Sequence, residues 1–153
     1  MKIALISNHF RQYKGGAEYQ SLLYADELKK SGHDIFFISC AKDGKNTLEE
    51  IEGDRVYHCS PGWIRHIPIL KNGDIYYFAL FRMRHILRTE QPDVILEIGE
   101  FSLNGILVFL GKRMKIPMVW VCASDSSLYP VKFNYRAPLS FPGRRLMVYG
   151  IRN

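Results

Sequence analysis

The sequence has few cysteines and no long apolar segment. Its three cysteines, Cys40, Cys59 and Cys122, form neither an even set nor a CxxC pair, and each lies in or at the end of a strand-like run. We therefore expect reduced core thiols, without disulfides or a metal site. The longest apolar stretch, residues 105–111, is far shorter than the roughly 20 residues that a bilayer-spanning helix needs. Met1 leads directly into a strand pattern, so we expect no secretory leader.

Two common nucleotide-binding motifs are also missing, the GxGxxG dinucleotide fingerprint and the Walker pattern. Their absence disfavours oxidoreductases with a dinucleotide cofactor and P-loop NTPases. The 153 residues are 47% hydrophobic and 24% charged, which is enough to fill one globular core. The formal charge of +6 favours phosphate-bearing ligands, anionic lipid or nucleic acid without choosing among them.

Short apolar runs alternate with helical stripes along the chain. We predict strands at residues 3–7, 34–40, 55–59, 93–98 and 117–122, and helices at residues 16–28, 75–90, 102–115 and 144–152. Residues 41–53 are polar and charged, which predicts a loop or a frayed helix, and residues 60–74 are irregular. This alternation predicts an α/β fold with a Rossmann-like, doubly wound, mostly parallel sheet and helices on both faces. The last predicted helix has no strand after it, so we expect a truncated domain.

In such a sheet, ligands bind at the carboxyl ends of the strands, near the point where the strand order reverses. The loop after the first strand is the most informative, because Lys14, Gly15 and Gly16 lead into a helix N-terminus. Unpaired amides and the positive end of the helix dipole can hold an oxyanion there. The glycine pair therefore predicts a phosphate site, unless it serves only a tight turn that needs glycine for its backbone angles.

Polar side chains that follow or close the other strands are candidates for binding sugar hydroxyls or for acting as a base. They are His9, Glu97, Glu100, Ser124 and Asp125. Glu100 and Asp125 also suit a solvated or helix-capping role, and a lone histidine such as His9 is often structural. Glu97 lies inside an apolar run, so it needs a partner if it is buried.

The predicted helix at residues 75–90 carries aromatic and cationic side chains on its outer face. Its expected core stripe is Tyr76, Ala79, Leu80, Met83, Ile86 and Leu87. Together with the preceding loop, the outer face forms a patch of Trp63, Arg65, Tyr77, Phe78, Phe81, Arg84 and Arg88. This mixture predicts a surface for anionic lipid headgroups, unless residues 60–74 fold back over the rings. Nucleic acid is not expected as a partner, because no recognition motif accompanies the patch.

The first forty residues include MKIALISNHF followed by KGGAEYQSLLYADELKKSGHDIFFIS, in which the Gly-His pair is Gly32 and His33. In this opening most specifically, the chain resembles family 4 glycosyltransferases of the GT-B fold. These enzymes open with a strand, a loop containing two glycines, a helix rich in Leu and Ala, a Gly-His pair and a second strand. Residues 91–95 (QPDVI) and 116–118 (IPM) resemble the starts of later strands in the family.

The resemblance implies that residues 1–153 are the acceptor-side, N-terminal domain of a retaining glycosyltransferase, with the donor domain absent. It implies a nucleotide-diphosphate sugar as donor, a glycan or lipid-linked acceptor, and no cofactor. By the same resemblance, Gly15 and Gly16 would meet the donor diphosphate across the cleft between two domains. Such a protein would be cytoplasmic and peripheral at the inner face of the membrane.

Two features depart from the family. Ala123, Ser124 and Asp125 stand where many members have a histidine, and no glutamate is followed by another eight residues later, as in the element that holds the donor. The catalytic residues therefore stay unassigned, and we expect this chain to be inactive alone. One alternative function is a non-catalytic subunit that recruits a two-chain glycosyltransferase to the membrane. Another is a flavodoxin-like, nucleotide-binding regulator.

Overall fold

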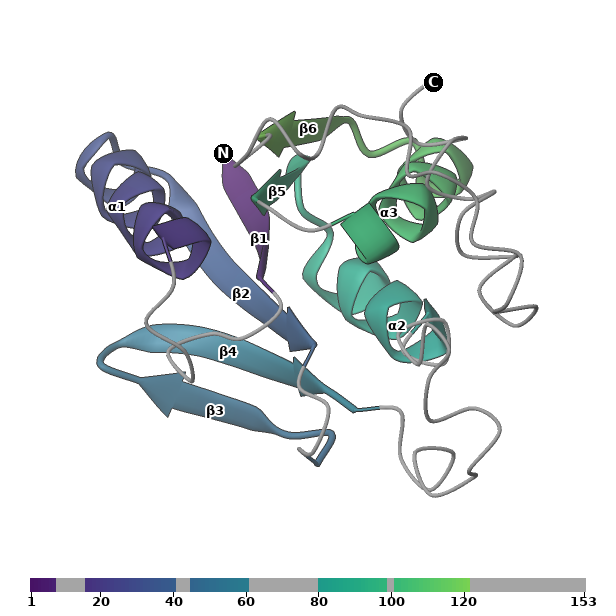
Figure 1. The fold of residues 1–153 in the computed structure, drawn as a ribbon, viewed down its shortest axis with the longest axis horizontal. Helices are drawn as coiled ribbons and strands as arrows, with labels where there is room; N and C mark the ends of the chain where they lie inside the picture. Colours follow the sequence, from purple (N-terminus) through teal and green to yellow (C-terminus); the bar gives the residue numbers. More distant parts are fainter. Residues whose placement is uncertain (8–15, 41–44, 61–79, 99–100, 122–153) are drawn as a thin grey trace.

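The computed structural model describes residues 1–7, 16–40, 45–60, 80–98 and 101–121 (Figure 1). In chain order, its elements are β1 (Lys2–Ser7), α1 (Gly16–Lys30), β2 (Asp34–Cys40), β3 (Leu48–Ile51), β4 (Asp54–Cys59), α2 (Leu80–Glu90), β5 (Val94–Ile98), α3 (Phe101–Met114) and β6 (Met118–Val121). All five predicted strands and the first three predicted helices are confirmed where the structure describes them. Residues 75–79 and the helix expected at residues 144–152 lie outside the described residues.

The strands form one sheet in the order β3-β4-β2-β1-β5-β6. Every neighbouring pair is parallel except β3 with β4, which is antiparallel. The chain moves outward from β1 through β2 to β4, then returns to the other side of β1 with β5 and β6. This order is that of a doubly wound sheet, and its switch point lies between β1 and β5.

The expectation of a loop or frayed helix before β4 was wrong, because Leu48–Ile51 forms the edge strand β3. Glu52 and Gly53 both have positive φ, of 52° and 83°, so they form a two-residue turn that folds β3 back onto β4. Turns of this kind match the right-handed twist of the strands that they join. The strand escaped prediction because its side chains are mostly exposed and two of them are glutamates, as suits the edge of a sheet.

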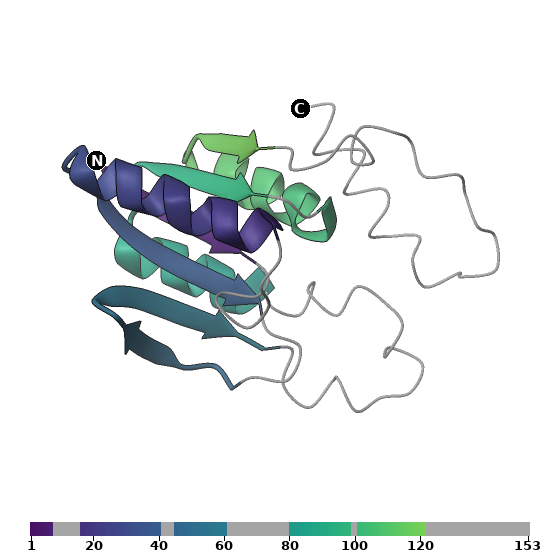
Figure 2. The ribbon, with the colours of Figure 1, turned by 60° about the vertical axis from the view of Figure 1, so that its left-hand side comes forward.

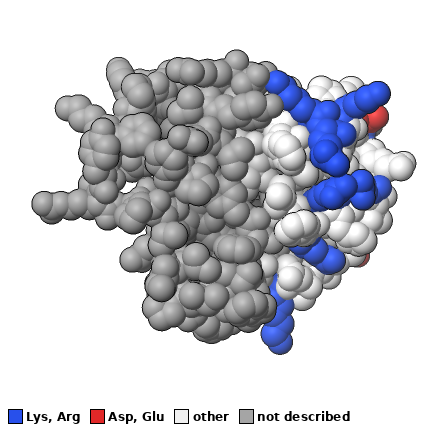
Figure 3. All heavy atoms as spheres, turned by 90° about the vertical axis from the view of Figure 1, so that its right-hand side faces the viewer, with Lys and Arg blue, Asp and Glu red and all other residues white. Residues whose placement is uncertain are grey.

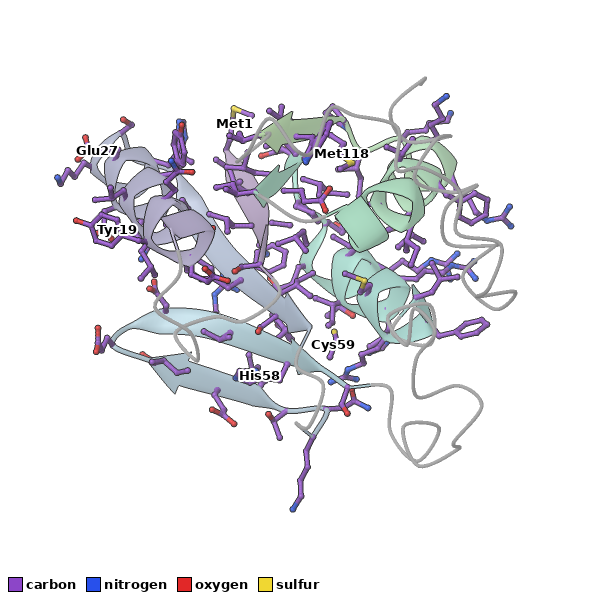
Figure 4. The ribbon with its side chains drawn as sticks, in the orientation of Figure 1. Met1, Tyr19, Glu27, His58, Cys59 and Met118 are labelled. Carbon is purple, nitrogen blue, oxygen red and sulfur yellow. The ribbon has the colours of Figure 1, made fainter. Side chains whose placement is uncertain are left out.

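Two apolar layers enclose the sheet, one on each face (Figures 1 and 2). The layer under α1 contains Leu5 and Phe37, whereas the layer under α2 and α3 contains Phe36 and Ile38. The central strands β1 and β2 are therefore buried on both sides, which is why their sequences are continuously apolar. Cys59 is a free, buried thiol of the second layer and points toward α2 (Figure 4).

The sequence of α1 predicts a core-facing stripe of Ala17, Ser21, Tyr24, Ala25 and Leu28. The helix is rotated slightly from that orientation. Ser21 and Ala25 are buried as expected, but Tyr24 is 45% exposed, which corrects its placement in the core stripe. Leu22 packs against the core instead. The rotation carries Tyr24 to the margin of the contact. Helix α1 ends at Lys30, and two residues later Gly32 has a φ of 82°, which glycine adopts with less strain than other residues.

A polar network at the amino ends of the strands fixes the end of α2 to the sheet. The Glu90 carboxylate lies 2.6 Å from Lys2 Nζ and 3.0 Å from an Arg55 nitrogen, and it accepts a hydrogen bond from the Tyr57 hydroxyl. Arg55 also binds both carboxylate oxygens of Asp34, at 2.8 and 2.9 Å. Burial and the bond to Glu90 raise the pKa of Tyr57 to about 12. Burial by itself would raise the pKa of Glu90. The hydrogen bonds and positive charges of its partners Lys2, Tyr57 and Arg55 outweigh burial, so the pKa of Glu90 lies below its usual value.

Candidate functional site

The carboxyl ends of β1, β5 and β6 lie next to one another at one edge of the sheet. β1 pairs in parallel with β5, and β5 pairs in parallel with β6. Helix α1 begins at the same edge, as Figure 2 shows. The three loops singled out in the sequence leave from these strand ends, although residues 8–15, 99–100 and 122–153 lie outside the described part of the chain. The topology thus forms the ligand-binding edge expected of a doubly wound sheet.

Gly16 is the first residue of α1 and is exposed. Its φ lies outside the positive region, unlike that of Gly32, and a Cβ built on it would meet no atom within 4 Å. Neither the backbone angle nor packing therefore requires glycine at this position. The amides of the first helical turn lack partners within the helix, and amides in this position can bind an anion. Lys14 and Gly15 lie outside the described residues.

Glu97 lies one residue before the end of β5 and is only 2% exposed. It alternates with Ile95, which places it on the face of the sheet that α2 and α3 cover. In register it lies between Ile6 of β1 and Trp120 of β6. The side chain makes a polar or electrostatic interaction, as a buried carboxylate must. Gly16 and Glu97 therefore approach the same edge from opposite faces of the sheet.

Two serines at this edge were not singled out in the sequence. Ser7 and Ser39 are register partners at the carboxyl ends of β1 and β2, and both are buried. They alternate with Leu5 and Phe37, so they lie on the face that α1 covers. The sequence feature that could have identified them is that each serine is the polar residue near the end of an apolar run. The candidates His9, Glu100, Ser124 and Asp125 lie outside the described residues.

Helix α2 has the amphipathic division that its sequence predicts. Met83, Ile86 and Leu87 are buried, whereas Phe81 is 75% exposed. Arg84 is half-buried and Arg88 exposed. The other residues of the proposed patch, Trp63, Arg65, Tyr77 and Phe78, lie outside the described residues.

The face formed by α2 and α3 is rich in lysine and arginine, as Figure 3 shows for its described part. The cationic residues are Arg82, Arg84, Arg88, Lys112, Arg113 and Lys115. None of the described helices has the length and apolar character needed to cross a membrane. Within the described ranges, no group of three or more His, Cys, Asp or Glu side chains is placed to hold a metal ion.

The sheet order, the switch point and the helix that begins beside it define a Rossmann-like domain with its ligand edge at the carboxyl ends of β1 and β5. The family model of Glycosyltransferase Family 4 matches residues 14–149. The chain therefore belongs to glycosyltransferase family 4, as the resemblance of its first forty residues predicts.

Two curated relatives illustrate the similarity. The UDP-N-acetylglucosamine--N-acetylmuramyl-(pentapeptide) pyrophosphoryl-undecaprenol N-acetylglucosamine transferase of Clostridium botulinum is 29% identical over 113 residues, which are 72% of this chain and 31% of the relative. A GDP-mannose-dependent alpha-mannosyltransferase of Corynebacterium glutamicum is 23% identical over 141 residues, covering 92% of this chain and 33% of the relative. The chain thus spans about a third of the length of these relatives.

Solved structures show the same fold. A UDP-GlcNAc 2-epimerase from Methanocaldococcus jannaschii superposes with a TM-score of 0.59 at 17% identity, covering 98% of this chain and 37% of the other. MurG of Acinetobacter baumannii superposes with a TM-score of 0.54 at 16% identity, covering 78% of this chain and 34% of the other. The described elements therefore have the architecture of one Rossmann-like unit of GT-B enzymes.

Proposed function

We propose that this chain is the acceptor-binding half of a retaining glycosyltransferase that uses a nucleotide-diphosphate sugar to build a lipid-linked or cell-surface glycan, and that it is inactive alone. Membership of glycosyltransferase family 4 supports the reaction class. The names of the two relatives include a pyrophosphoryl-undecaprenol acceptor and a GDP-mannose donor, which supports this kind of substrate. The span of about a third of each relative supports the view that a further domain supplies the donor site.

The observation that carries the proposal is the start of α1 at the switch-point edge. Gly16 leaves the first turn without a side chain at a position where the fold does not require glycine. A diphosphate oxygen can therefore approach the helix amides closely, and the dipole favours its charge. As the bond to the sugar breaks, negative charge grows on the leaving diphosphate, and preorganised amides stabilise that charge in the transition state.

The remaining roles follow from position at the same edge. Lys14 and Gly15 would contact the diphosphate together with Gly16. The contacts to acceptor and sugar would come from His9, Glu97, Glu100, Ser124 and Asp125. Holding the acceptor hydroxyl beside the donor carbon lowers the entropic part of the barrier.

The direct test compares the 153-residue chain alone with the same chain joined to the C-terminal domain of a family relative. We expect no donor hydrolysis or transfer by the chain alone, and measurable transfer by the joined protein. The anomeric configuration of the product, followed by NMR, reports whether transfer occurs with retention. Turnover by the isolated chain would refute the half-enzyme proposal.

A second candidate function is a non-catalytic subunit that recruits its partner to the membrane. It is favoured by Phe81, whose ring is 75% exposed beside the cationic side chains of α2. An exposed ring and flanking arginines suit the headgroup region of an anionic bilayer.

Liposome flotation tests this candidate. Phe81→Ser should abolish binding to vesicles rich in phosphatidylglycerol. Tyr19→Ser should leave binding unchanged, because Tyr19 is a similarly exposed ring, at 64%, but projects from α1 on the opposite face (Figure 4). Equal loss in both variants, or no binding by the unaltered chain, would refute a recruiting role.

A further inference from the structure

A groove of about 530 Å³ lies between the ends of α2 and α3. Its polar lining consists of Arg88, Gln91, Asp93, Arg113 and Lys115. We call it the amino-edge groove, because it lies at the amino ends of two strands. Asp93 immediately precedes β5, and Lys115 precedes β6 by a short turn. It is therefore at the opposite end of the strands from the candidate glycosyltransferase site, so a ligand bound in it is separate from the proposed donor and acceptor, although Arg88 also belongs to the patch on α2.

Within the described part of the chain, the three cations of the groove have no acidic partner. Arg88, Arg113 and Lys115 are exposed, and none of them makes an ion pair with another residue that the structure describes. The lysines at the end of α1 differ, since Lys29 pairs with Asp54 and Lys30 pairs with Glu27 at 2.6 Å.

The two acids nearest to the groove in the chain are already engaged. Glu90 faces the sheet, where Lys2, Arg55 and Tyr57 bind its carboxylate. Asp93 accepts a hydrogen bond from the backbone N–H of Lys2 at 2.6 Å. Among the described residues, the positive charge of the groove is thus only partly offset, and a concave site with charge of one sign concentrates ions of the opposite sign.

The residue that follows each of the two helices, Gln91 after α2 and Lys115 after α3, has a strained backbone and a polar side chain. Gln91 has a φ of 48° and Lys115 a φ of 59°, in the left-handed region that favours glycine at the end of a helix. A cation near a helix C-terminus is favourable in itself, which is a sufficient structural reason for Arg88 and Arg113. It does not explain why Lys115 occupies a position where glycine would be less strained.

We propose that the amino-edge groove binds a phosphate-bearing ligand. Arg88 and Arg113 can each bind two phosphate oxygens through the guanidinium fork, while Lys115 adds a point charge and the Gln91 amide a neutral donor. The volume falls within the range of small-molecule sites and exceeds what a single phosphate fills, so it suits a diphosphate or a phosphorylated headgroup.

The test uses the whole 153-residue chain and inorganic pyrophosphate, with amide chemical shifts as the readout. We expect saturable shifts at Gln91, Lys115 and Ile116, and at least tenfold weaker binding in the Arg88→Gln, Arg113→Gln double variant. Lys45→Gln is the matched control, because it removes an exposed cation that lies before β3, away from the groove. Absence of saturable shifts at the groove, or equal weakening in the control, would overturn the proposal.

Lys115→Gly separates binding from stability. Glycine relieves the left-handed backbone, so the melting temperature should hold or rise while pyrophosphate binding weakens several-fold. A lower melting temperature with unchanged binding would show that the cation serves only the helix end, and would overturn the proposal.

Vesicles then identify the source of the phosphate. If phosphatidylglycerol vesicles compete with pyrophosphate, and Lys115→Gly, which leaves the patch on α2 unaltered, weakens vesicle binding, the ligand is a lipid headgroup. If pyrophosphate binds but the vesicles do not displace it, the ligand is a free phosphorylated molecule. Both results support the groove as a phosphate site.

Discussion

Replacing Gly16 with alanine should separate folding from ligand binding more sharply than any other single change. The new methyl group meets no atom within 4 Å, and the backbone angle suits any residue. Alanine in place of glycine in a helix stabilises it by up to about 1 kcal/mol, mainly because the unfolded chain loses freedom. We therefore expect Gly16→Ala to leave the free energy of unfolding unchanged or slightly raised.

The affinity of the same variant for pyrophosphate should fall. The methyl group occupies the space through which a diphosphate oxygen would reach the first amides of α1. Loss of one charge-assisted hydrogen bond costs about 1.5–3 kcal/mol. Because about 1.4 kcal/mol is a tenfold change, the affinity for pyrophosphate should fall by roughly ten- to a hundredfold.

The assay is a pyrophosphate titration followed at the amides of residues 16–21, together with urea unfolding. These amides are at the opposite sheet edge from Gln91 and Lys115, so the two proposed sites report separately. Gly32→Ala is the matched control. Its φ of 82° predicts a loss of about 1 kcal/mol in stability with no change in binding at the start of α1. Unchanged pyrophosphate binding in Gly16→Ala would refute the diphosphate role.

The remaining predictions concern stability. Gly111→Ala should destabilise the fold by about 1–3 kcal/mol in urea, because its Cβ would lie 2.8 Å from the carbonyl oxygen of Ile116, and an unchanged midpoint would contradict this contact. The pKa of Glu90 lies below its ordinary value of 4.5, so the unfolded state binds more protons and stability falls as pH drops through the folded-state pKa. Glu90→Gln should flatten that acid limb in urea midpoints measured across the acid range, and an unaltered slope would exclude this carboxylate as its source. The pKa of Tyr57 is raised from 10.0 to about 12, so its contribution is complete below pH 10 and is lost as pH rises toward 12. Tyr57→Phe should remove this alkaline decline in the same measurement, and persistence of the decline would point to another group.

Much of the fold follows from local patterns. β1 and β2 were predictable because strands buried on both faces need continuous apolar side chains. The end of α1 was predictable because Gly32 tolerates the left-handed backbone that terminates a helix. Strand β3 was not predictable, since an exposed edge strand requires no apolar alternation and its pairing depends on the turn at Glu52 and Gly53.

For the candidate site, the sequence by itself determined that a glycine-containing loop leads from a buried strand into a helix, and that the chain belongs with glycosyltransferase family 4. Only the tertiary structure decided which strands meet, and therefore that Gly16 and Glu97 share an edge but lie on opposite faces of the sheet. It also brought Arg88 and Arg113 to one groove while Glu90 turned to the sheet. The physical reason is that the spacing of apolar residues shows which side of one helix or strand is buried. Which charged side chains pair with one another depends on residues that are distant in the chain.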